Sequence, residues 1–342
     1  MKNLFVTLLL IFPLIANAQH TFSIVAVDTF TGDIGSAGAT CGDSIIWPGT
    51  PGALIISDII PGVGAIHTQA YYISANQENA HNRMVSGDSP QEIIAWLTSN
   101  DVDFNPSIRQ YGIVDYNGGS PRSAGYTGTN CNSYKNHITG SNYAIQGNIL
   151  LGQQILDSME SRFINMEGCL SDKLMAALQG ANVLGADKRC IPQGTSSLSA
   201  FLRVAKPTDQ PDALFIDLNI AGTPQGIEPI SELQTKYNNW KINNDHDCST
   251  VSIHPELAEI TDILLYPNPT DKVIQIKSPV TNINQIIITD ISGKIMLSKN
   301  LPMGAGEPIQ VSLDFLNNGM YIIALFDDKG VIYRKKIMLN AD

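Results

Sequence analysis

A polar tract around residue 250 divides the chain into two parts with different sequence patterns. Residues 243–260 are mixed in charge and lack a strong hydrophobic period, which is typical of a linker. Before this tract, strand-like and helix-like segments alternate, whereas only short strand-like segments follow it. Because the chain has 342 residues and a domain takes about 150, we expect two domains.

The two parts also differ in charge. Residues 263–342 hold 8 basic and 7 acidic side chains, whereas the whole chain has 21 Lys and Arg against 32 Asp and Glu. No basic cluster is present to neutralise consecutive phosphates, so nucleic-acid binding is not expected. Hydrophobic residues make up 43% and charged residues only 15%, a balance that favours packed domains over disorder.

The N-terminus has the order of a secretory signal peptide. Lys2 precedes an apolar stretch from Leu4 to Ile15, and Ala16-Asn17-Ala18 supplies small residues, so cleavage after Ala18 is predicted. This stretch is too short to span a bilayer, and no later run reaches the roughly 18 apolar residues of a membrane helix. Export implies an oxidising compartment, in which cysteines can pair.

Five cysteines are present, so one remains after two disulfides form. Their spacing predicts Cys169 with Cys190, around a helix, and Cys41 with Cys131, leaving Cys248 in the linker. A Cys nucleophile is the alternative, although no cysteine stands in a recognisable catalytic signature. Neither CxxC, HExxH, GxGxxG nor a Walker-type loop occurs, so we expect no metal and no cofactor.

The first part predicts a layered α+β domain. A hairpin is expected from residues 21–27 and 34–40, because these runs flank a turn at residues 28–33. Ser89-Pro90-Gln91-Glu92 combines an N-cap, a first-turn Pro and a capping-box Glu, so a helix begins there. Further strands are predicted over residues 53–60, 63–70, 108–114, 143–149, 197–204 and 213–218, and helices over 151–163, 170–178 and 229–240.

The second part predicts a small all-β sandwich without a catalytic constellation. Its short strands recur at regular spacing, with turns at Ser292-Gly293, Asn317-Asn318-Gly319 and Asp328-Lys329-Gly330. The expected strands span residues 273–277, 285–290, 294–298, 309–313, 319–326 and 331–339.

This second part resembles the C-terminal sorting domain of the type IX, or Por, secretion system. The matching pieces, in the family's order, are Tyr266-Pro-Asn-Pro269, Asp290-Ile-Ser-Gly293-Lys294, Asn318-Gly319-Met320-Tyr321 and Lys335-Lys336-Ile337. The resemblance implies a Gram-negative source and export across the outer membrane, followed by release or attachment at the cell surface. The implied partners of residues 263–342 are the type IX machinery and its sortase. An ordinary binding sandwich is the alternative.

The first part resembles the domain-of-unknown-function-1028 family, which is grouped with the N-terminal nucleophile (Ntn) hydrolases. The matching pieces are residues 20–26, 62–69, 126–128, 146–150, 185–189 and 216–218. The resemblance implies a four-layer αββα Ntn-hydrolase-like domain and, by analogy, hydrolysis of a small amide or peptide. The expected order is a signal peptide over 1–18, this domain over 19–240, a linker over 241–262 and the sorting domain over 263–342.

In an Ntn hydrolase, an N-terminal Thr, Ser or Cys attacks an amide carbonyl while its own α-amine takes up the proton. The resemblance makes Thr21, at the start of the first strand, the candidate nucleophile. Cleavage after Ala18 would leave Gln19-His20 ahead of it, and an N-terminal Gln can cyclise. Trimming could expose Thr21, Thr21 could use His20 or His67 as its base, or the domain could be a noncatalytic surface binding domain.

Polar residues on two predicted strands are candidates for supporting roles. His67 is either a catalytic residue or a buried structural His, and Gln69 on the same strand could contact the substrate. Gln146 and Asn148 alternate around Gly147, so both amides lie on one face of a strand. They could bind a polar substrate or an oxyanion, or they could satisfy loop backbone.

A charged run in a Gly-flanked loop supplies the remaining candidates. Lys188 could act in catalysis by lowering the pKa of the nucleophile or could hold a substrate carboxylate. Asp187 and Arg189 are candidate substrate contacts in the same loop. A solvated surface charge run is the alternative interpretation of all three residues.

Overall fold

The structure is a computed structural model that describes residues 21–45, 49–117, 120–244, 246, 263–278, 283–290, 294–301, 308–327 and 330–340. The predicted signal peptide, His20 and Cys248 lie outside the described residues. The chain divides into two compact units. Residues 1–163 and 174–240 belong to one, and residues 164–173 and 241–342 to the other.

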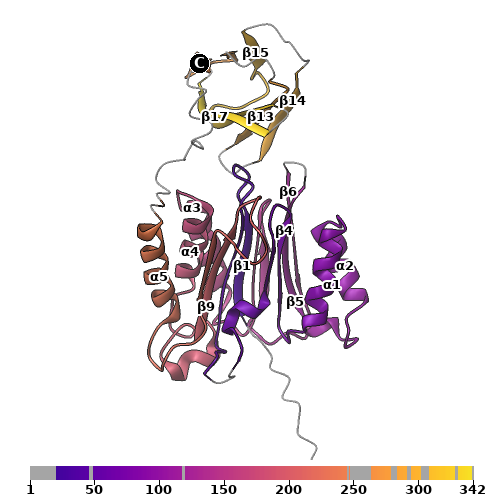
Figure 1. Ribbon diagram of the computed structural model, residues 1–342, viewed down its shortest axis with the longest axis vertical. Helices are drawn as coiled ribbons and strands as arrows, with labels where there is room; N and C mark the ends of the chain where they lie inside the picture. Colours follow the sequence, from indigo (N-terminus) through magenta and orange to yellow (C-terminus); the bar gives the residue numbers. More distant parts are fainter. Residues whose placement is uncertain are drawn as a thin grey trace, which may run out of the picture. The chain divides into compact units, whose positions relative to one another are not determined.

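A six-stranded antiparallel sheet forms the centre of the first unit (Figure 1). The predicted hairpin is present as β1 (Thr21–Val27) and β2 (Ile34–Thr40), which pair along their full length. The strand order is β10-β9-β2-β1-β8-β7. The outer strands are β7 (Asn136–Thr139), β8 (Tyr143–Gly147), β9 (Ser199–Ala205) and β10 (Ile216–Ile220).

A second antiparallel sheet contains β3 (Ser57–Ile60), β4 (Gly64–Gln69), β5 (Gln110–Asn117) and β6 (Ser120–Thr127), in that order. The strand predicted over residues 53–60 is shorter than expected, because Gly52–Ile56 forms a 3-10 helix, η1. In this helix the Ala53 N–H donates to Ser199 Oγ at 2.9 Å, so the segment bonds to the end of β9 instead of extending β3.

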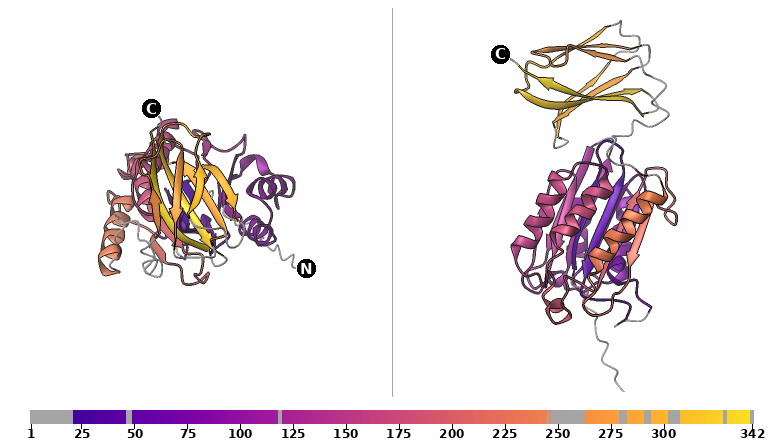
Figure 2. Two further views of the ribbon diagram at one scale, coloured as in Figure 1. Left: turned by 90° about the horizontal axis from the view of Figure 1, so that it is seen from above. Right: turned by 90° about the vertical axis from the view of Figure 1, so that its left-hand side faces the viewer.

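Helices cover the outer faces of the two sheets (Figures 1 and 2). α1 (Ser74–Val85) and α2 (Pro90–Ser99) lie on the four-stranded sheet. α3 (Gln153–Asn165), α4 (Leu170–Gly180) and α5 (Pro229–Asn243) lie on the six-stranded sheet. The predicted capping box of α2 is confirmed, because the Glu92 N–H donates to Ser89 Oγ and the Ser89 N–H donates to Glu92. No described helix is both long and apolar enough to cross a membrane.

The layer between the two sheets changes character along the strands. At the Val27 end it is apolar, with a buried cluster of Val25, Val27, Ile34, Ile59, Ala65, Val114, Ala144 and Ala205. Burial of each Val or Ile side chain stabilises the fold by about 1.5–3 kcal/mol. At the Thr21 end the same layer holds buried hydroxyls and amides instead. The apolar end therefore fixes the sheets together, and the polar end requires hydrogen bonds.

Both predicted disulfides are wrong. Cys41 pairs with Cys190, and their Cα atoms lie 5.6 Å apart. Cys41 directly follows β2, and the 3-10 helix η3 (Lys188–Gln193) is held beside that strand end, where the Cys41 N–H donates to Asp187 Oδ2 at 3.1 Å. Cys131 is instead a buried free thiol that donates to the Arg109 carbonyl at 3.2 Å. Sequence spacing alone contains no information on this approach of η3 to β2.

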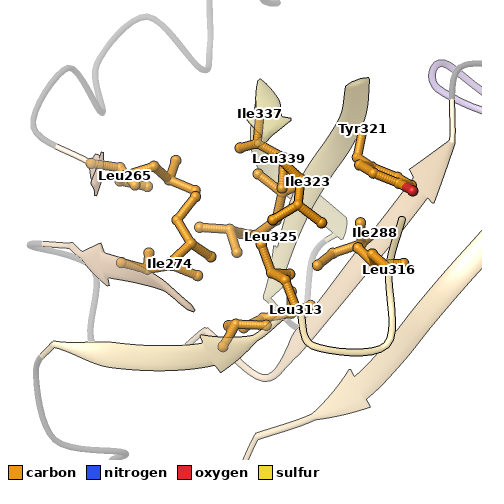
Figure 3. Close-up of a cluster of buried hydrophobic side chains, with 14 of the residues drawn as sticks. Leu265, Ile274, Ile288, Leu313, Leu316, Tyr321, Ile323, Leu325, Ile337 and Leu339 are labelled. Carbon is orange, nitrogen blue, oxygen red and sulfur yellow. The ribbon is translucent and has the colours of Figure 1, made fainter. Parts of the chain in front are cut away.

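From Leu264 onward, the described part of the second unit is all-β. One sheet holds β11 (Leu264–Tyr266), β12 (Val273–Lys277) and β15 (Ile309–Ser312). The other has the order β14-β13-β16-β17, with β13 (Gln285–Asp290), β14 (Ile295–Asn300), β16 (Gly319–Asp327) and β17 (Gly330–Leu339). Side chains from both sheets share one hydrophobic core that includes Leu265, Ile274, Ile288, Ile323, Leu325 and Ile337 (Figure 3). The chain is thus an α+β domain with antiparallel sheets, followed by small all-β sheets.

Candidate functional site

Thr21 begins the central strand β1 and is fully buried at the polar end of the layer between the sheets. It lies opposite Thr40 of β2 in the strand pair. Side chains two residues apart share one face of a strand, so Thr21 faces the same way as Ser23, whose hydroxyl donates to Gln69 Oε1 on the second sheet at 2.6 Å. The Thr21 carbonyl accepts from Gln69 Nε2 at 3.1 Å and from the Asn148 N–H at 3.2 Å.

A buried amide, Gln110 of β5, connects the groups that hold Thr21. Its Oε1 accepts from Gln69 Nε2 at 2.7 Å and from Asn148 Nδ2 at 2.9 Å. Its Nε2 lies 2.9 Å from the Gly147 carbonyl and 3.0 Å from the Asn136 carbonyl, to which it donates. Gln110 thereby joins strands of both sheets directly beside the start of β1.

His67 lies deeper in the same layer. Its Nε2 is 2.6 Å from Ser36 Oγ, and its Nδ1 is 3.1 Å from Gln146 Nε2. The ring is fully buried, and this burial, assisted by the positive charge of Arg203, lowers its pKa to about 3. His67 is therefore neutral near neutral pH, and it reaches Thr21 only through other side chains.

An ion pair at the start of η3 contacts Thr40, the β2 residue that lies opposite Thr21. Asp187 is fully buried, and its Oδ2 lies 2.6 Å from Arg189 Nη2. Arg189 also donates to Thr40 Oγ1 at 3.3 Å, and Thr40 is the β2 residue opposite Thr21. Lys188 joins this group through its backbone, because its N–H donates to the Ile149 carbonyl at 3.0 Å, next to Asn148.

Three non-glycine residues with left-handed backbone follow the residues that hold Thr21. Ala70 (φ 55°) and Tyr71 (φ 53°) follow Gln69, and Ile149 (φ 55°) follows Asn148. The Tyr71 carbonyl accepts from Arg109 Nη1, and Arg109 is itself paired with the buried carboxylate of Asp101 at 2.8 Å. Such conformations cost about 1–3 kcal/mol each and tend to cluster at functional sites. This clustering marks the Thr21 end as the candidate site.

The structure gathers the predicted site residues in two groups. Gln69 and Asn148 contact Thr21 directly, and Arg189 with Asp187 reaches its neighbour Thr40. Gln146 and His67 form the deeper group, which joins Thr21 through Ser23 and Gln69. Sequence reasoning did not identify four participating residues, namely Ser23, Ser36, Thr40 and Gln110.

A usable signal existed for three of these residues. Ser23 lies two residues after Thr21, whereas Ser36 and Thr40 are hydroxyl residues on the partner strand of the predicted hairpin. Gln110 gave no signal, because its partners Gln69 and Asn148 lie 41 and 38 residues away in the sequence. Within the part of the chain that the structure describes, no group of His, Cys, Asp and Glu side chains could hold a metal ion.

Comparisons with known proteins find a different family in each of the two parts of the chain. Residues 21–233 match the model of a family of unknown function, DUF1028, and residues 264–340 match the secretion system C-terminal sorting domain. The crystal structure of protein SPO2555 from Silicibacter pomeroyi, a DUF1028 protein, is similar at 24% identity and a TM-score of 0.52. The match covers 65% of this chain and 89% of that one, and at this identity it shows the fold alone. No curated protein matches.

Proposed function

The chain belongs to the family of unknown function DUF1028, and from this membership and the polar site around Thr21 we propose that it is an Ntn-type amide hydrolase. In this proposal, processing after export makes Thr21 the first residue of the mature protein. Its hydroxyl then attacks the carbonyl of a small amide or peptide. Its α-amine is suited to accept the proton, because its reference pKa is about 7.7–8.0.

The C-terminal sorting domain determines where this chemistry would take place. Residues 264–340 are a secretion system sorting domain of the Por type, so the protein is exported through the periplasm of a Gram-negative bacterium to the cell surface or the medium. Interaction with the type IX machinery follows from the same domain. We further propose that a sortase removes this domain from residue 263 onward.

The position of Thr21 is the observation that carries the proposal. Thr21 is fully buried at the polar end of the layer between the sheets, and its carbonyl is held by both Gln69 and Asn148. Those two bonds would keep the residue in place after the preceding chain is cut. We interpret the order helices, sheet, sheet, helices as the four-layer αββα arrangement of Ntn hydrolases.

The ion pair between Asp187 and Arg189 supports two roles for the charged residues 187–189, namely tuning of the α-amine and substrate binding. A guanidinium close to the new N-terminus would lower the pKa of the α-amine and so keep more of it unprotonated. Arg189 would supply this charge, and the buried Asp187 carboxylate would orient it. We propose that Arg189 and Lys188 also favour substrates that carry a carboxylate, since both extend the positive charge of this loop.

The reaction then proceeds in two balanced steps. Thr21 Oγ1 forms a bond to the substrate carbonyl carbon while its proton moves to the α-amine, and the carbon–nitrogen bond breaks as that proton passes to the leaving amine. Water next attacks the carbonyl carbon of the ester on Thr21 and loses a proton to the same α-amine, and the bond between that carbon and Thr21 Oγ1 breaks as the proton passes to Oγ1. The products are the free acid and the regenerated hydroxyl. Gln69 and Asn148 hold the reacting residue throughout.

An acylating electrophile tests the proposal directly. The secreted wild-type protein is incubated with a β-lactone, and the labelled peptide is identified by mass spectrometry. We expect one acyl group on the peptide that begins with Thr21. Thr21→Ser retains the label because a Ser hydroxyl can perform the same attack, whereas Thr21→Ala removes it.

A matched control separates catalysis from fold. Thr223→Ala changes another buried Thr of the first domain, whose hydroxyl donates to the Ile227 carbonyl at 2.8 Å, and it leaves the Thr21 hydroxyl in place. We expect this variant to be labelled. Absence of label on wild-type Thr21 in folded protein would contradict the proposal and favour a noncatalytic surface binding domain.

A further inference from the structure

Buried side chains connect the Thr21 carbonyl to His67, and the direction of each hydrogen bond in this connection can be worked out. The Thr21 carbonyl oxygen can only accept a hydrogen bond. The Gln69 side-chain atom 3.1 Å from it is therefore the amide nitrogen. The second N–H of that nitrogen donates to Gln110 Oε1 at 2.7 Å. The amide orientation of Gln69 is thus fixed by a backbone group.

Gln110 provides a second, independent anchor. Its side-chain nitrogen faces the carbonyls of Gly147 at 2.9 Å and Asn136 at 3.0 Å, and both of these are backbone acceptors. Its oxygen must then face Gln69 and Asn148, which is the orientation that Gln69 also requires. The Thr21 carbonyl on one side and the carbonyls of Gly147 and Asn136 on the other therefore require the same orientations of the Gln69 and Gln110 amides.

The orientation of Gln69 in turn determines which groups donate and which accept at Ser23 and Gln146. Gln69 Oε1 is an acceptor, so the Ser23 hydroxyl donates its only hydrogen to it at 2.6 Å. Ser23 Oγ can then only accept from the side-chain nitrogen of Gln146, which lies 2.6 Å away. The second N–H of Gln146 points to His67 Nδ1 at 3.1 Å.

His67 must consequently accept at Nδ1. A neutral imidazole with an unprotonated Nδ1 carries its hydrogen on Nε2, and Nε2 lies 2.6 Å from Ser36 Oγ. Nε2 therefore donates to Ser36, which leaves the Ser36 hydroxyl free to donate to Ser57 Oγ at 2.7 Å. A ring that accepts at Nδ1 and donates at Nε2 has no lone pair left to remove a proton from a substrate.

Reversal of the Gln146 amide is excluded by its surroundings. In the present orientation Oε1 lies against Gly112 and has no hydrogen-bond partner, although it is buried. A reversed amide would bring two N–H donors to this position in place of the unpaired oxygen. It would also direct Gln146 Oε1 at Ser23 Oγ, whose hydrogen is already donated to Gln69.

We propose that His67, as the neutral Nε2–H tautomer, is a positioning residue that orients Thr21 through Gln146, Ser23 and Gln69. The tautomer follows from the hydrogen bonds alone, whereas its effect on a nucleophile rests on the proposed function. The charged group that acts on the ring is Arg203 of β9, which interacts with Asp217 at 3.2 Å and contacts Ser57. A second positive charge on the ring would be repelled by this guanidinium.

The tautomer is tested by nitrogen NMR on the full chain labelled with 15N-histidine. The protein has 6 His residues, and the signals absent from the His67→Asn spectrum identify His67. We expect an unprotonated Nδ1 and a protonated Nε2, both unchanged between pH 8 and pH 5. A protonated Nδ1, or a titration near the ordinary pKa of 6.5, overturns the proposal.

Two isosteric variants test the positioning role. In His67→Asn the side-chain oxygen takes the place of Nδ1 and still accepts from Gln146, whereas His67→Gln keeps a donor near Nε2 and loses that acceptor. We expect β-lactone labelling of Thr21 to stay within about threefold of wild type in His67→Asn and to fall about tenfold in His67→Gln, the factor given by one lost hydrogen bond.

The outcomes separate the two proposals. If His67→Gln is labelled like wild type while His67→Asn is not, the positioning role is wrong. If wild-type Thr21 is not labelled at all, the proposed hydrolase fails, and the NMR measurement still decides the tautomer. Equal loss of labelling in both variants, with unchanged melting temperatures, would also contradict positioning through Nδ1.

Discussion

Gly112 leaves the space that Gln146 occupies, so Gly112→Ala is a sensitive test of the buried polar layer. A Cβ at this position would lie 1.8 Å from Gln146 Oε1, 2.3 Å from Cδ and 2.7 Å from Nε2. A carbon and an oxygen need about 3.5 Å of separation, so the amide has to move by about 1.7 Å. Its hydrogen bonds to Ser23 (2.6 Å) and His67 (3.1 Å) do not survive such a shift.

The cost can be assembled from these contacts. Two buried hydrogen bonds contribute about 1 kcal/mol each. Overpacking in a close-packed interior costs a further 1–3 kcal/mol or so. We therefore expect Gly112→Ala to lower the free energy of unfolding by about 3–5 kcal/mol.

Tryptophan fluorescence in urea measures this change in the full chain. All 3 Trp residues precede the sorting domain, at positions 47, 96 and 240, so the signal reports on the first domain. The midpoint should fall by about 1–2 M urea, because the loss of free energy per molar urea rises with protein size and reaches roughly 3 kcal/mol for a domain as large as this one. Gly222→Ala is the matched control, since its nearest neighbours lie 3.2 Å or more from the added Cβ.

A double variant identifies the clash as the cause. Gln146→Ala removes the amide that the new methyl group meets, so Gly112→Ala should cost at least about 1 kcal/mol less in its presence than alone. A Gly112→Ala protein that unfolds at the wild-type midpoint would refute the described position of Gln146, and with it the orientation of His67.

Three further predictions concern other buried groups. Burial raises the pKa of the Cys131 thiol to about 11, so iodoacetamide at pH 8 should leave it unmodified in native protein, and rapid stoichiometric alkylation would contradict its burial. Reduction of Cys41–Cys190 should lower stability by about 2–4 kcal/mol and increase hydrogen exchange in residues 187–194, and unchanged exchange there would show that the disulfide does not hold η3. Because burial lowers the pKa of folded His67 to about 3, unfolding takes up a proton below pH 6.5, and stability is lost as pH falls. Burial raises the pKa of Asp33 to about 6, so Asp33 makes stability change with pH in the opposite direction. Wild type is therefore compared with His67→Asn, because both proteins contain Asp33. The free energy of unfolding of wild type should fall by up to about 1.4 kcal/mol more per pH unit below 6.5 than that of the variant.

Sequence patterns predicted elements whose signals are local. The capping box at Ser89 gave the start of α2, and the alternating run from Thr21 gave β1. α1 was not predicted, because only Asn76, Ala80 and Met84 of this polar helix are buried. β6 was also missed, since its half-buried sequence lacks a regular apolar alternation and contains Pro121.

The site was less predictable, because its residues meet across the two sheets. Thr21 and Gln69 were identified from family-like motifs, but the contact between them depends on how the second sheet lies on the first. Ser36 reads as an ordinary small strand residue, and only its 2.6 Å approach to His67 gives it a role. The true partner of Cys41 is 149 residues away, and spacing alone could not select it.

The mass of the mature N-terminus in the secreted protein tests the central claim most directly. We predict a chain that begins at Thr21 and whose N-terminal amino alcohol is cleaved by periodate, a reaction that requires a free amine beside the hydroxyl. A chain that begins with residue 19, blocked as pyroglutamate and inert to periodate, would contradict the account. In that case Thr21 would have no α-amine to use, and the polar layer around it would serve binding or structure alone.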